Sequence, residues 1–283
     1  MSLKNIVVTG ASGKAGRAIT KDLVEHGYTV SATDAVAPPA DLGASFLRAD
    51  LTDYGQTVEI LHGADAVVHM AAIPSNGIYT PGKTFTDNTA MNSNVFLVAA
   101  QLGLQRVVWA SSETTLGLSF TPETPPRYAP VDEDHFPYPT STYALSKVVG
   151  ETLAEHISGW SGIPFVGLRF SNIFEPEAYA RVPSFQGDAS IRQTNLWGYI
   201  DVRDVAAACR NALEASTTGS ENVIIAAADT IMNRPSVDLM REVFPDVQIR
   251  REVGEHETLL SIAKARELLG FEPRHSWRDE VTL

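Results

Sequence analysis

The stretch Val7–Gly16, "VVTGASGKAG", places three glycines between an apolar run and an amphipathic segment. Gly10, Gly13 and Gly16 follow the predicted strand "NIVVTG" and open the predicted helix "AGRAITKDLVEHG". In dinucleotide-binding loops the first glycine makes a tight turn, the second admits the pyrophosphate and the third lets the helix pack on the strand. The free N–H groups of the helix N-terminus then face the diphosphate. The spacing therefore predicts a phosphate-binding loop at the start of an α/β fold.

The same stretch departs from the loop that binds nucleoside triphosphates. That loop needs a glycine five positions before Gly13, where Val8 stands, and a hydroxyl after Lys14, where Ala15 stands. Asp34 ends the next predicted strand, "YTVSATD", and a carboxylate there can accept both ribose hydroxyls of NAD and repel the 2′-phosphate of NADP. An ordinary turn aspartate remains the alternative, and Arg17 could serve a 2′-phosphate. The sequence favours NAD over NADP.

Strand and helix patterns alternate along the first two thirds of the chain. Further apolar strands are predicted at "DAVVHMAA", "RVVWASS" and "PFVGLRFSNIF", with a helix at "SKVVGETLAEHIS". This alternation predicts an α/β fold with a doubly wound parallel sheet of the Rossmann type. Residues 118–142 are rich in proline and predict a long irregular connection. We expect an NAD-binding domain over residues 1–170 and a small C-terminal substrate lobe over 171–283, with 197–228 returning to the first domain.

Composition excludes several classes of protein. The 283 residues carry a net charge of −12, which argues against a nucleic-acid or anionic-membrane partner. The single Cys209 allows no internal disulfide, and no apolar run of membrane-spanning length or signal-peptide pattern occurs, so a cytoplasmic location is expected. The histidines lack metal-ligand spacing with cysteine or carboxylate, so no metal is predicted.

The segment "STYALSK" places Tyr143 and Lys147 four residues apart on one helix face. A phenol has a pKa of about 10, and a neighbouring ammonium together with the positive nicotinamide ring would lower it enough for proton transfer. The segment "WASSE" ends a strand with Ser111 and Ser112, where ligand sites of open α/β sheets lie. One of the two hydroxyls is expected to bind the reacting oxygen. A surface helix pair and strand-end serines are the alternatives that carry no chemistry.

In their order, these motifs resemble those of the NAD-dependent epimerase/dehydratase family, the extended short-chain dehydrogenases. The segments that carry the resemblance are TGxxGxxG, Asp34, "ADLTD" (49–53), "HMAA" (69–72), "WASSE", "YALSK", "LRFSNIF" (168–174), "WGYIDVRDVAAA" (197–208) and "SIAKARELLGFEPRHSWRDEV" (261–281). Together they span nearly the whole chain.

The resemblance implies roles for individual residues. Ser112 matches the catalytic hydroxyl, because it stands five before Gly117. Tyr143 matches the acid/base, and Lys147 the residue that holds the nicotinamide ribose and tunes Tyr143. Cofactor contacts are implied for Gly10, Ser12, Gly13, Lys14, Ala15, Gly16, Asp34, Asp50, Leu51, Met70, Ala71, Ala72, Tyr143, Lys147 and Phe170. Substrate contacts are implied for Ser75, Ser112 and Asn172.

The sequence departs from the family pattern in three places, and the third bears on the substrate. Leu116 replaces the usual tyrosine before Gly117, and Glu175 replaces the usual glycine before Pro176. The stretch from Asn172 to Asp201 is about half the length usual in members that use nucleotide sugars. Short members such as uronate dehydrogenases, which use free sugar acids, are similarly trimmed. Arg181 and Arg192 lie in this stretch and could clamp a carboxylate.

We therefore expect an NAD-dependent oxidoreductase that moves a hydride at a hydroxyl-bearing carbon of a sugar, sugar acid or similar small molecule. A nucleotide-sugar 4-epimerase of the UDP-glucose 4-epimerase type is the first alternative. A non-catalytic dinucleotide sensor is the second, because one fold serves many functions. The resemblance also implies a homodimer formed through helices near 92–102 and 143–158.

Overall fold

The computed structural model describes residues 3–135 and 137–282. Seven parallel strands form one sheet in the order β3-β2-β1-β4-β5-β6-β9, and the short strands β7 and β8 pair separately. The order reverses between β1 and β4, as in a doubly wound fold. The strands of the sheet are β1 (Asn5–Thr9), β2 (Thr29–Asp34), β3 (Ser45–Arg48), β4 (Ala66–His69), β5 (Arg106–Ala110), β6 (Phe165–Phe170) and β9 (Ser220–Ile225). The predicted α/β class and parallel sheet are confirmed.

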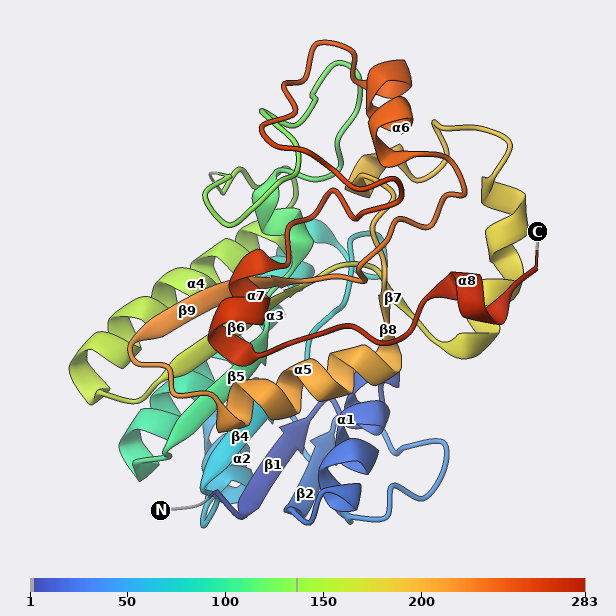
Figure 1. Ribbon diagram of the computed structural model, residues 1–283. Coiled ribbons are helices and arrows are strands. Elements are labelled where there is room, and N and C mark those ends of the chain that lie inside the picture. The colour runs from blue at the N-terminus through green and yellow to red at the C-terminus, as the bar shows by residue number, and fades with distance from the viewer. Residues whose placement is uncertain (1–2, 136, 283) are drawn as a thin grey trace.

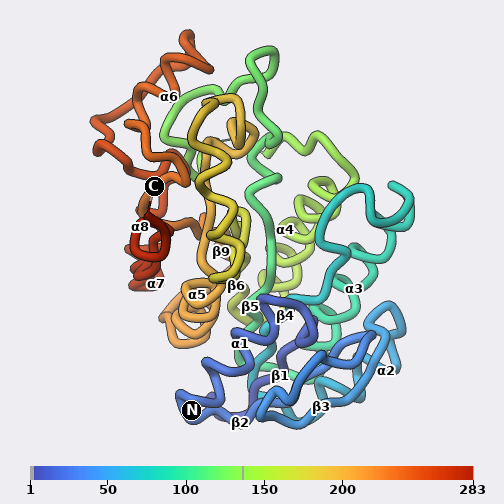
Figure 2. The backbone as a smooth tube through the Cα atoms, turned by 90° about the vertical axis from the view of Figure 1, so that its right-hand side faces the viewer, coloured from blue at the N-terminus to red at the C-terminus, as the bar shows by residue number. Residues whose placement is uncertain are grey.

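Helices cover both faces of the sheet. Figure 2 shows α3 and α4 on one side and α1 and α5 on the other. The α-helices are α1 (Lys14–Glu25), α2 (Tyr54–Leu61), α3 (Pro81–Leu102), α4 (Thr142–Ser161), α5 (Val202–Glu214), α6 (Ser236–Val243), α7 (Ala263–Leu269) and α8 (Trp277–Glu280). Short 3-10 helices occur at η1 (Glu113–Leu116), η2 (Pro176–Phe185) and η3 (Gln193–Asn195), and the second sheet pairs β7 (Ile173–Phe174) with β8 (Ile200–Asp201).

Alternate residues of the central strand enter two different cores. Ile6 and Val8 of β1 pack with apolar side chains of α1 and α5, whereas Val7 belongs to the core under α3 and α4. Side chains of a strand point alternately to its two faces, so an unbroken apolar run indicates a strand buried on both faces. This is why "NIVV" predicts a central strand.

Two elements differ in extent from the sequence prediction. The helix expected near residues 92–102 is the second half of α3, which begins at Pro81, a residue that suits the first turn of a helix. The sequence does not predict the edge strand β3, because only one of its four residues, Phe46, is even partly buried and packed against the core.

The C-terminal lobe has a core of its own. Aromatic side chains of the lobe, among them Phe174, Tyr179, Trp197 and Trp277, are buried together. Figure 1 shows this lobe, with α6 at the top, beyond the carboxyl ends of the sheet strands. The irregular connection 118–142 joins it through bridges from Ala129 and Val131 to residues 249 and 260. The division into two domains near residue 170 stays a prediction, and β9 supplies the last strand of the main sheet.

The turn between β1 and α1 leaves no room for side chains at two glycines. Gly10 has a φ of +66°, and a Cβ there would lie 2.6 Å from the backbone N of Ala71. A Cβ on Gly16 would lie 2.1 Å from the carbonyl oxygen of Gly10. Only glycine therefore allows α1 to start so close to the ends of β1 and β4.

Replacing Gly16 with alanine should reduce the free energy of unfolding by about 1–3 kcal/mol, because the new methyl group overlaps backbone that cannot move freely. Urea denaturation measures the change. Gly159 is the matched control, since it lies in α4 and a methyl group added there would meet no atom within 4 Å. Gly159→Ala should instead stabilise the protein by about 0.5–1 kcal/mol. Equal effects of the two substitutions would contradict the packing described for the turn.

Candidate active site

The glycine loop lies at the amino end of α1. Gly13 is the N-cap residue of α1, and within the described chain no side chain caps this helix. The N–H groups of the first turn therefore remain available for an anion. A Cβ at Gly10 would strike Met70 and Ala71, which bring the end of β4 against the loop. These features fit the diphosphate of a dinucleotide.

Asp34 ends β2 beside the glycine loop. Its Oδ2 accepts the backbone N–H of Ser12 at 3.0 Å, and its Oδ1 accepts that of Val36 at 3.2 Å. The carboxylate is thus fixed against the glycine loop. Arg17 has partners within the chain, because its guanidinium donates to the Ser12 carbonyl and forms an ion pair with Glu175 at 2.8 Å. This ion pair gives a structural role to Glu175, which stands where the family pattern has a glycine.

The other predicted cofactor residues lie around the same loop. Lys14 turns its ammonium to the Ile173 carbonyl, and burial lowers the pKa of its side chain. The Ala71 N–H donates to the Thr9 hydroxyl at 3.1 Å, and that hydroxyl also hydrogen-bonds the buried ring of His69 at 2.7 Å. Burial lowers the pKa of His69 to about 3, so its ring is neutral and structural.

Asp50 and Leu51, two of the predicted cofactor residues, follow β3. Asp50 accepts hydrogen bonds from the hydroxyl and the N–H of Thr52, which lower the pKa of its carboxyl. Leu51 is buried under α2 and α3, and Phe170 ends β6 with its ring buried. Contacts of these residues with a cofactor stay predictions.

Lys147 is buried at the carboxyl end of β5. Its Nζ donates to the carbonyl oxygen of Ala110 at 2.7 Å and lies 5.6 Å from the centre of the Tyr143 ring. Burial lowers the pKa of Lys147 to about 8, against the opposing effect of the Glu151 carboxylate. The ammonium and the phenol thus meet on one face of α4, as the spacing predicts.

The two serines after β5 have different environments. The Ser111 hydroxyl donates to Glu151 at 2.6 Å, and Arg169 pairs with the same buried carboxylate through two hydrogen bonds of 2.9 Å. Ser111 is therefore committed to a structural network. Ser112 accepts hydrogen bonds from Thr114 and also hydrogen-bonds Tyr143. The structure brings Ser112, and not Ser111, to the phenol.

Tyr143 has a raised pKa in this environment. Burial raises the pKa to about 12, the hydrogen bond with Ser112 lowers it, and the charge of Glu113 raises it. The sequence led us to expect a lowered pKa for Tyr143, and with Lys147 as the only cation beside the phenol this lowering is absent. The Nζ of Lys147 is turned to the Ala110 carbonyl instead. The positive charge of a nicotinamide ring would have to supply it.

The predicted substrate residues Ser75 and Asn172 are both exposed, each in a loop after a strand of the sheet. Ser75 is exposed in the loop after β4, next to Asn76, whose Oδ1 accepts the N–H of Tyr143 at 3.3 Å. Asn172 is exposed after β6, and its carbonyl accepts the N–H of Ile200. Sequence reasoning missed Glu113, which directly follows Ser112, and the buried Ser171 and Asn195, which hydrogen-bond the Glu113 carboxyl group.

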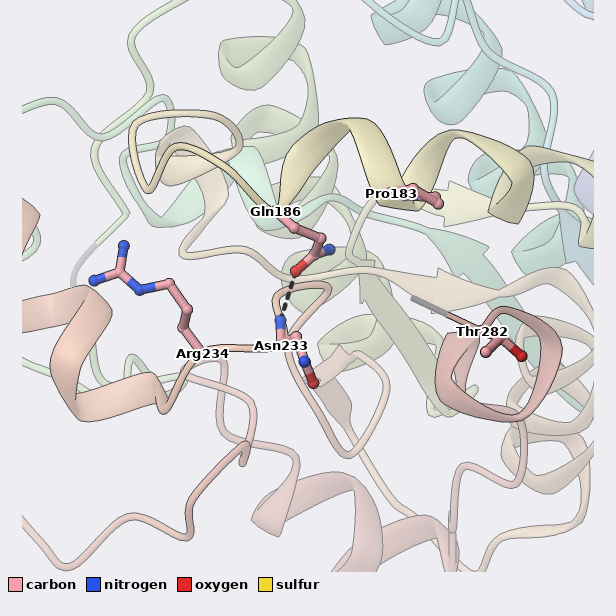
Figure 3. Close-up of a pocket in the computed structure, with 5 residues that line it drawn as sticks. All are labelled: Pro183, Gln186, Asn233, Arg234 and Thr282. Atoms are coloured by element: carbon pink, nitrogen blue, oxygen red, sulfur yellow. Dashed lines mark hydrogen bonds between the residues drawn. The ribbon is translucent and has the colours of Figure 1, made fainter.

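A pocket lies elsewhere, in the C-terminal lobe. It is lined by Pro183, Gln186, Asn233, Arg234 and Thr282 (Figure 3). The Asn233 N–H donates to Gln186 Oε1 at 2.7 Å across it. None of the predicted site residues lines this pocket.

The described part of the chain offers neither a metal centre nor a membrane span. No group of three or more histidine, cysteine, aspartate and glutamate residues in the described ranges could hold a metal ion. Within the same ranges, every helix is too short or too polar to cross a bilayer.

Comparisons with known proteins point to the same family as the sequence motifs. The model of the NAD dependent epimerase/dehydratase family matches residues 6–227. A UDP-glucose 4-epimerase of Lacticaseibacillus casei is 26% identical, with 98% of this chain and 94% of that protein aligned. A uronate dehydrogenase of Pseudomonas putida is 26% identical over 60% of this chain and 61% of its own length. The solved UDP-glucose 4-epimerase of Thermotoga maritima superposes with a TM-score of 0.74 at 22% identity, covering 98% of this chain and 96% of that one.

The buried Lys147 ammonium should make stability depend on pH. Its pKa is about 8 in the folded protein and about 10.4 when unfolded, so the unfolded chain binds more protons between these values. The free energy of unfolding should therefore rise from pH 8 to pH 10 by an amount on the order of 2–3 kcal/mol relative to Lys147→Met.

Urea denaturation of both proteins at several pH values measures this difference. Lys83→Met is the control, because exposed Lys83 pairs with Asp87 and its pKa is raised, out of the same window. A difference between wild type and Lys147→Met that stays constant with pH would contradict the assignment.

Proposed function

The protein belongs to the NAD-dependent epimerase/dehydratase family, and we propose that it transfers a hydride at a hydroxyl-bearing carbon of a sugar, sugar acid or similar small molecule. The observation that carries the proposal is the meeting of Ser112, Tyr143 and Lys147 at the carboxyl end of β5. A phenol, a hydroxyl and an ammonium beside a dinucleotide loop form a proton-transfer set that a mere sensor would not need.

Each residue of the chain has a distinct task in this reaction. Ser112 holds the substrate oxygen, Tyr143 accepts the hydroxyl proton during oxidation and returns it during reduction, and Lys147 fixes the phenol and binds the nicotinamide ribose. NAD, held by the glycine loop and Asp34, supplies the hydride acceptor and a positive charge. Asp34 and the engaged Arg17 favour NAD over NADP.

The trimmed stretch between Asn172 and Asp201 favours a small substrate. Between the short strands β7 and β8 it contains η2 and η3, and side chains such as Phe185 and Trp197 are buried in the core of the lobe. A nucleotide-sugar 4-epimerase is the second candidate, and the alignment of nearly the whole chain with the Lacticaseibacillus casei enzyme favours it. We also propose a homodimer through α3 and α4 and a cytoplasmic location.

One assay separates the candidates. The protein is mixed with NAD or NADP and with neutral sugars, sugar acids or UDP-glucose, and nicotinamide absorbance and sugar composition are followed. Net reduction of NAD with a free sugar or sugar acid is expected. Interconversion of UDP-glucose without net reduction would instead identify an epimerase, and binding of NAD with neither reaction would identify a sensor.

Tyr143→Phe removes the acid/base and should lower kcat by about 10²–10⁴-fold while NAD affinity changes little. Steady-state kinetics and fluorescence titration of NAD measure the two effects. Tyr54→Phe is the matched control, because on α2 it loses only a hydrogen bond to Gln101 and should turn over normally. Undiminished turnover in Tyr143→Phe would remove this residue from the mechanism.

A further inference from the structure

A buried carboxylate lies one helical turn beyond Lys147. Glu151 of α4 is 7% exposed, and residues four apart on a helix share one face. Its Oε1 accepts the Ser111 hydroxyl at 2.6 Å and the Arg169 Nε–H at 2.9 Å, and its Oε2 accepts an Nη2–H of Arg169 at 2.9 Å. The carboxylate is therefore fixed between α4 and the ends of β5 and β6.

The ion pair of Glu151 and Arg169 is not explained by stability alone. Arg169 is 4% exposed, so both charges are out of water, and the cost of removing them from water largely cancels their attraction. Replacing such a pair with apolar side chains of similar volume is often neutral or stabilising. The neighbouring ammonium of Lys147 gives a second reason for a carboxylate at this place.

Lys147 brings a further positive charge into the same region. Its side chain is 2% exposed, and its Nζ donates to the carbonyl of Ala110, the residue directly before Ser111. Burial lowers the pKa of Lys147 to about 8, and the Glu151 carboxylate opposes this shift. At neutral pH the ammonium therefore keeps its proton with the help of Glu151.

Titratable side chains from several elements face this part of the chain. The ring of His69 is neutral, since burial lowers its pKa to about 3. The negative charge that acts on Lys147 comes from Glu151. The charge of Glu113 acts on the Tyr143 phenol instead. The groups and their elements are His69 of β4, Tyr143 and Glu151 of α4, Glu113 of η1, Arg169 of β6, and Glu133 of the irregular connection, which faces Arg169.

We propose that Glu151 is a positioning residue that keeps the Lys147 ammonium charged and in place, and thereby assists the loss of the proton from Tyr143. The inference rests on the proposed function, in which Tyr143 is the acid/base. Glu151 acts through Lys147 and not on the reacting atoms, while Ser111 and Arg169 orient its carboxylate. Without its proton, Lys147 would lose the positive charge that stabilises the phenolate.

Two substitutions separate the charge of Glu151 from its shape. Glu151→Gln keeps the size of the side chain and removes its charge, whereas Glu151→Asp keeps the charge and shortens the side chain. A purely structural role depends on the shape, so Glu151→Asp would then be the more disturbed variant. The proposed role depends on the charge, so Glu151→Gln should be the more disturbed one.

The titration of Lys147 itself tests this role without requiring turnover. NMR spectra of the full-length protein with ¹³C at lysine Cε are recorded from about pH 6 to about pH 10, and the signal missing from Lys147→Met identifies Lys147. We expect its midpoint to fall by about one pH unit or more in Glu151→Gln and to stay near the wild-type value in Glu151→Asp. Glu155→Gln, an exposed position on the same helix, is the control and should titrate like the wild type.

The NAD complex links this role to Tyr143. The tyrosinate absorbance of each protein minus that of the same protein carrying Tyr143→Phe reports the phenolate. With saturating NAD, the phenolate should appear at a higher pH in Glu151→Gln than in the wild type and in Glu151→Asp, because Lys147 loses its charge more easily in that variant.

A Lys147 midpoint that is unchanged in Glu151→Gln, or that moves more in Glu151→Asp, would overturn the proposal. So would a phenolate that appears at the same pH in all three proteins. If Glu151→Gln alone does not fold, its combination with Arg169→Met leaves no unpaired charge at the former ion pair and should also lower the Lys147 midpoint. Failure of the proposed function has a different appearance: no phenolate appears in any of these proteins with NAD, and the lysine titration still decides the role of Glu151.

Discussion

The buried ammonium of Lys147 is the interaction on which the proposed site depends. A charged group out of water is costly unless hydrogen bonds and opposite charge compensate it. The carbonyl of Ala110 accepts from it at 2.7 Å, and Glu151, one turn later on α4, adds a favourable charge. Glu151 is in turn held by Ser111 and Arg169. This network joins α4 to β5 and β6, and it therefore fixes Tyr143 one turn before Lys147 beside Ser112.

The glycine loop is the second fixed part of the site, and its shape depends on the absence of side chains at two glycines. Gly10 and Gly16 let α1, β1 and the end of β4 approach more closely than any side chain would allow. The helix N-terminus and Asp34 are thereby presented on the same edge of the sheet as the network around Lys147. The proposed dinucleotide loop and the proposed proton-transfer residues thus lie at the same edge of the sheet.

The parts of the molecule that could be predicted from the sequence are those that depend on residues close together in the chain. The unbroken apolar run of β1, the glycine spacing and the four-residue step from Tyr143 to Lys147 each report on one element. The cluster of Glu113, Ser171 and Asn195 could not be predicted, because its members come from three separate segments that only the folded lobe brings together. A glutamate directly after the proposed catalytic serine was the one signal available. The direction in which the pKa of Tyr143 shifts could not be predicted from the sequence either, because burial and the orientation of Lys147 decide it.

The central claim is that Tyr143 becomes a base only when a second positive charge joins Lys147. The most direct measurement is the tyrosinate absorbance of the wild type minus that of Tyr143→Phe, recorded from about pH 6 to about pH 10 with and without saturating NAD. The account predicts no difference signal in this range without NAD, in agreement with a pKa of about 12, and a phenolate signal below about pH 9 with NAD. The absence of a phenolate signal over the whole range in the NAD complex would contradict it.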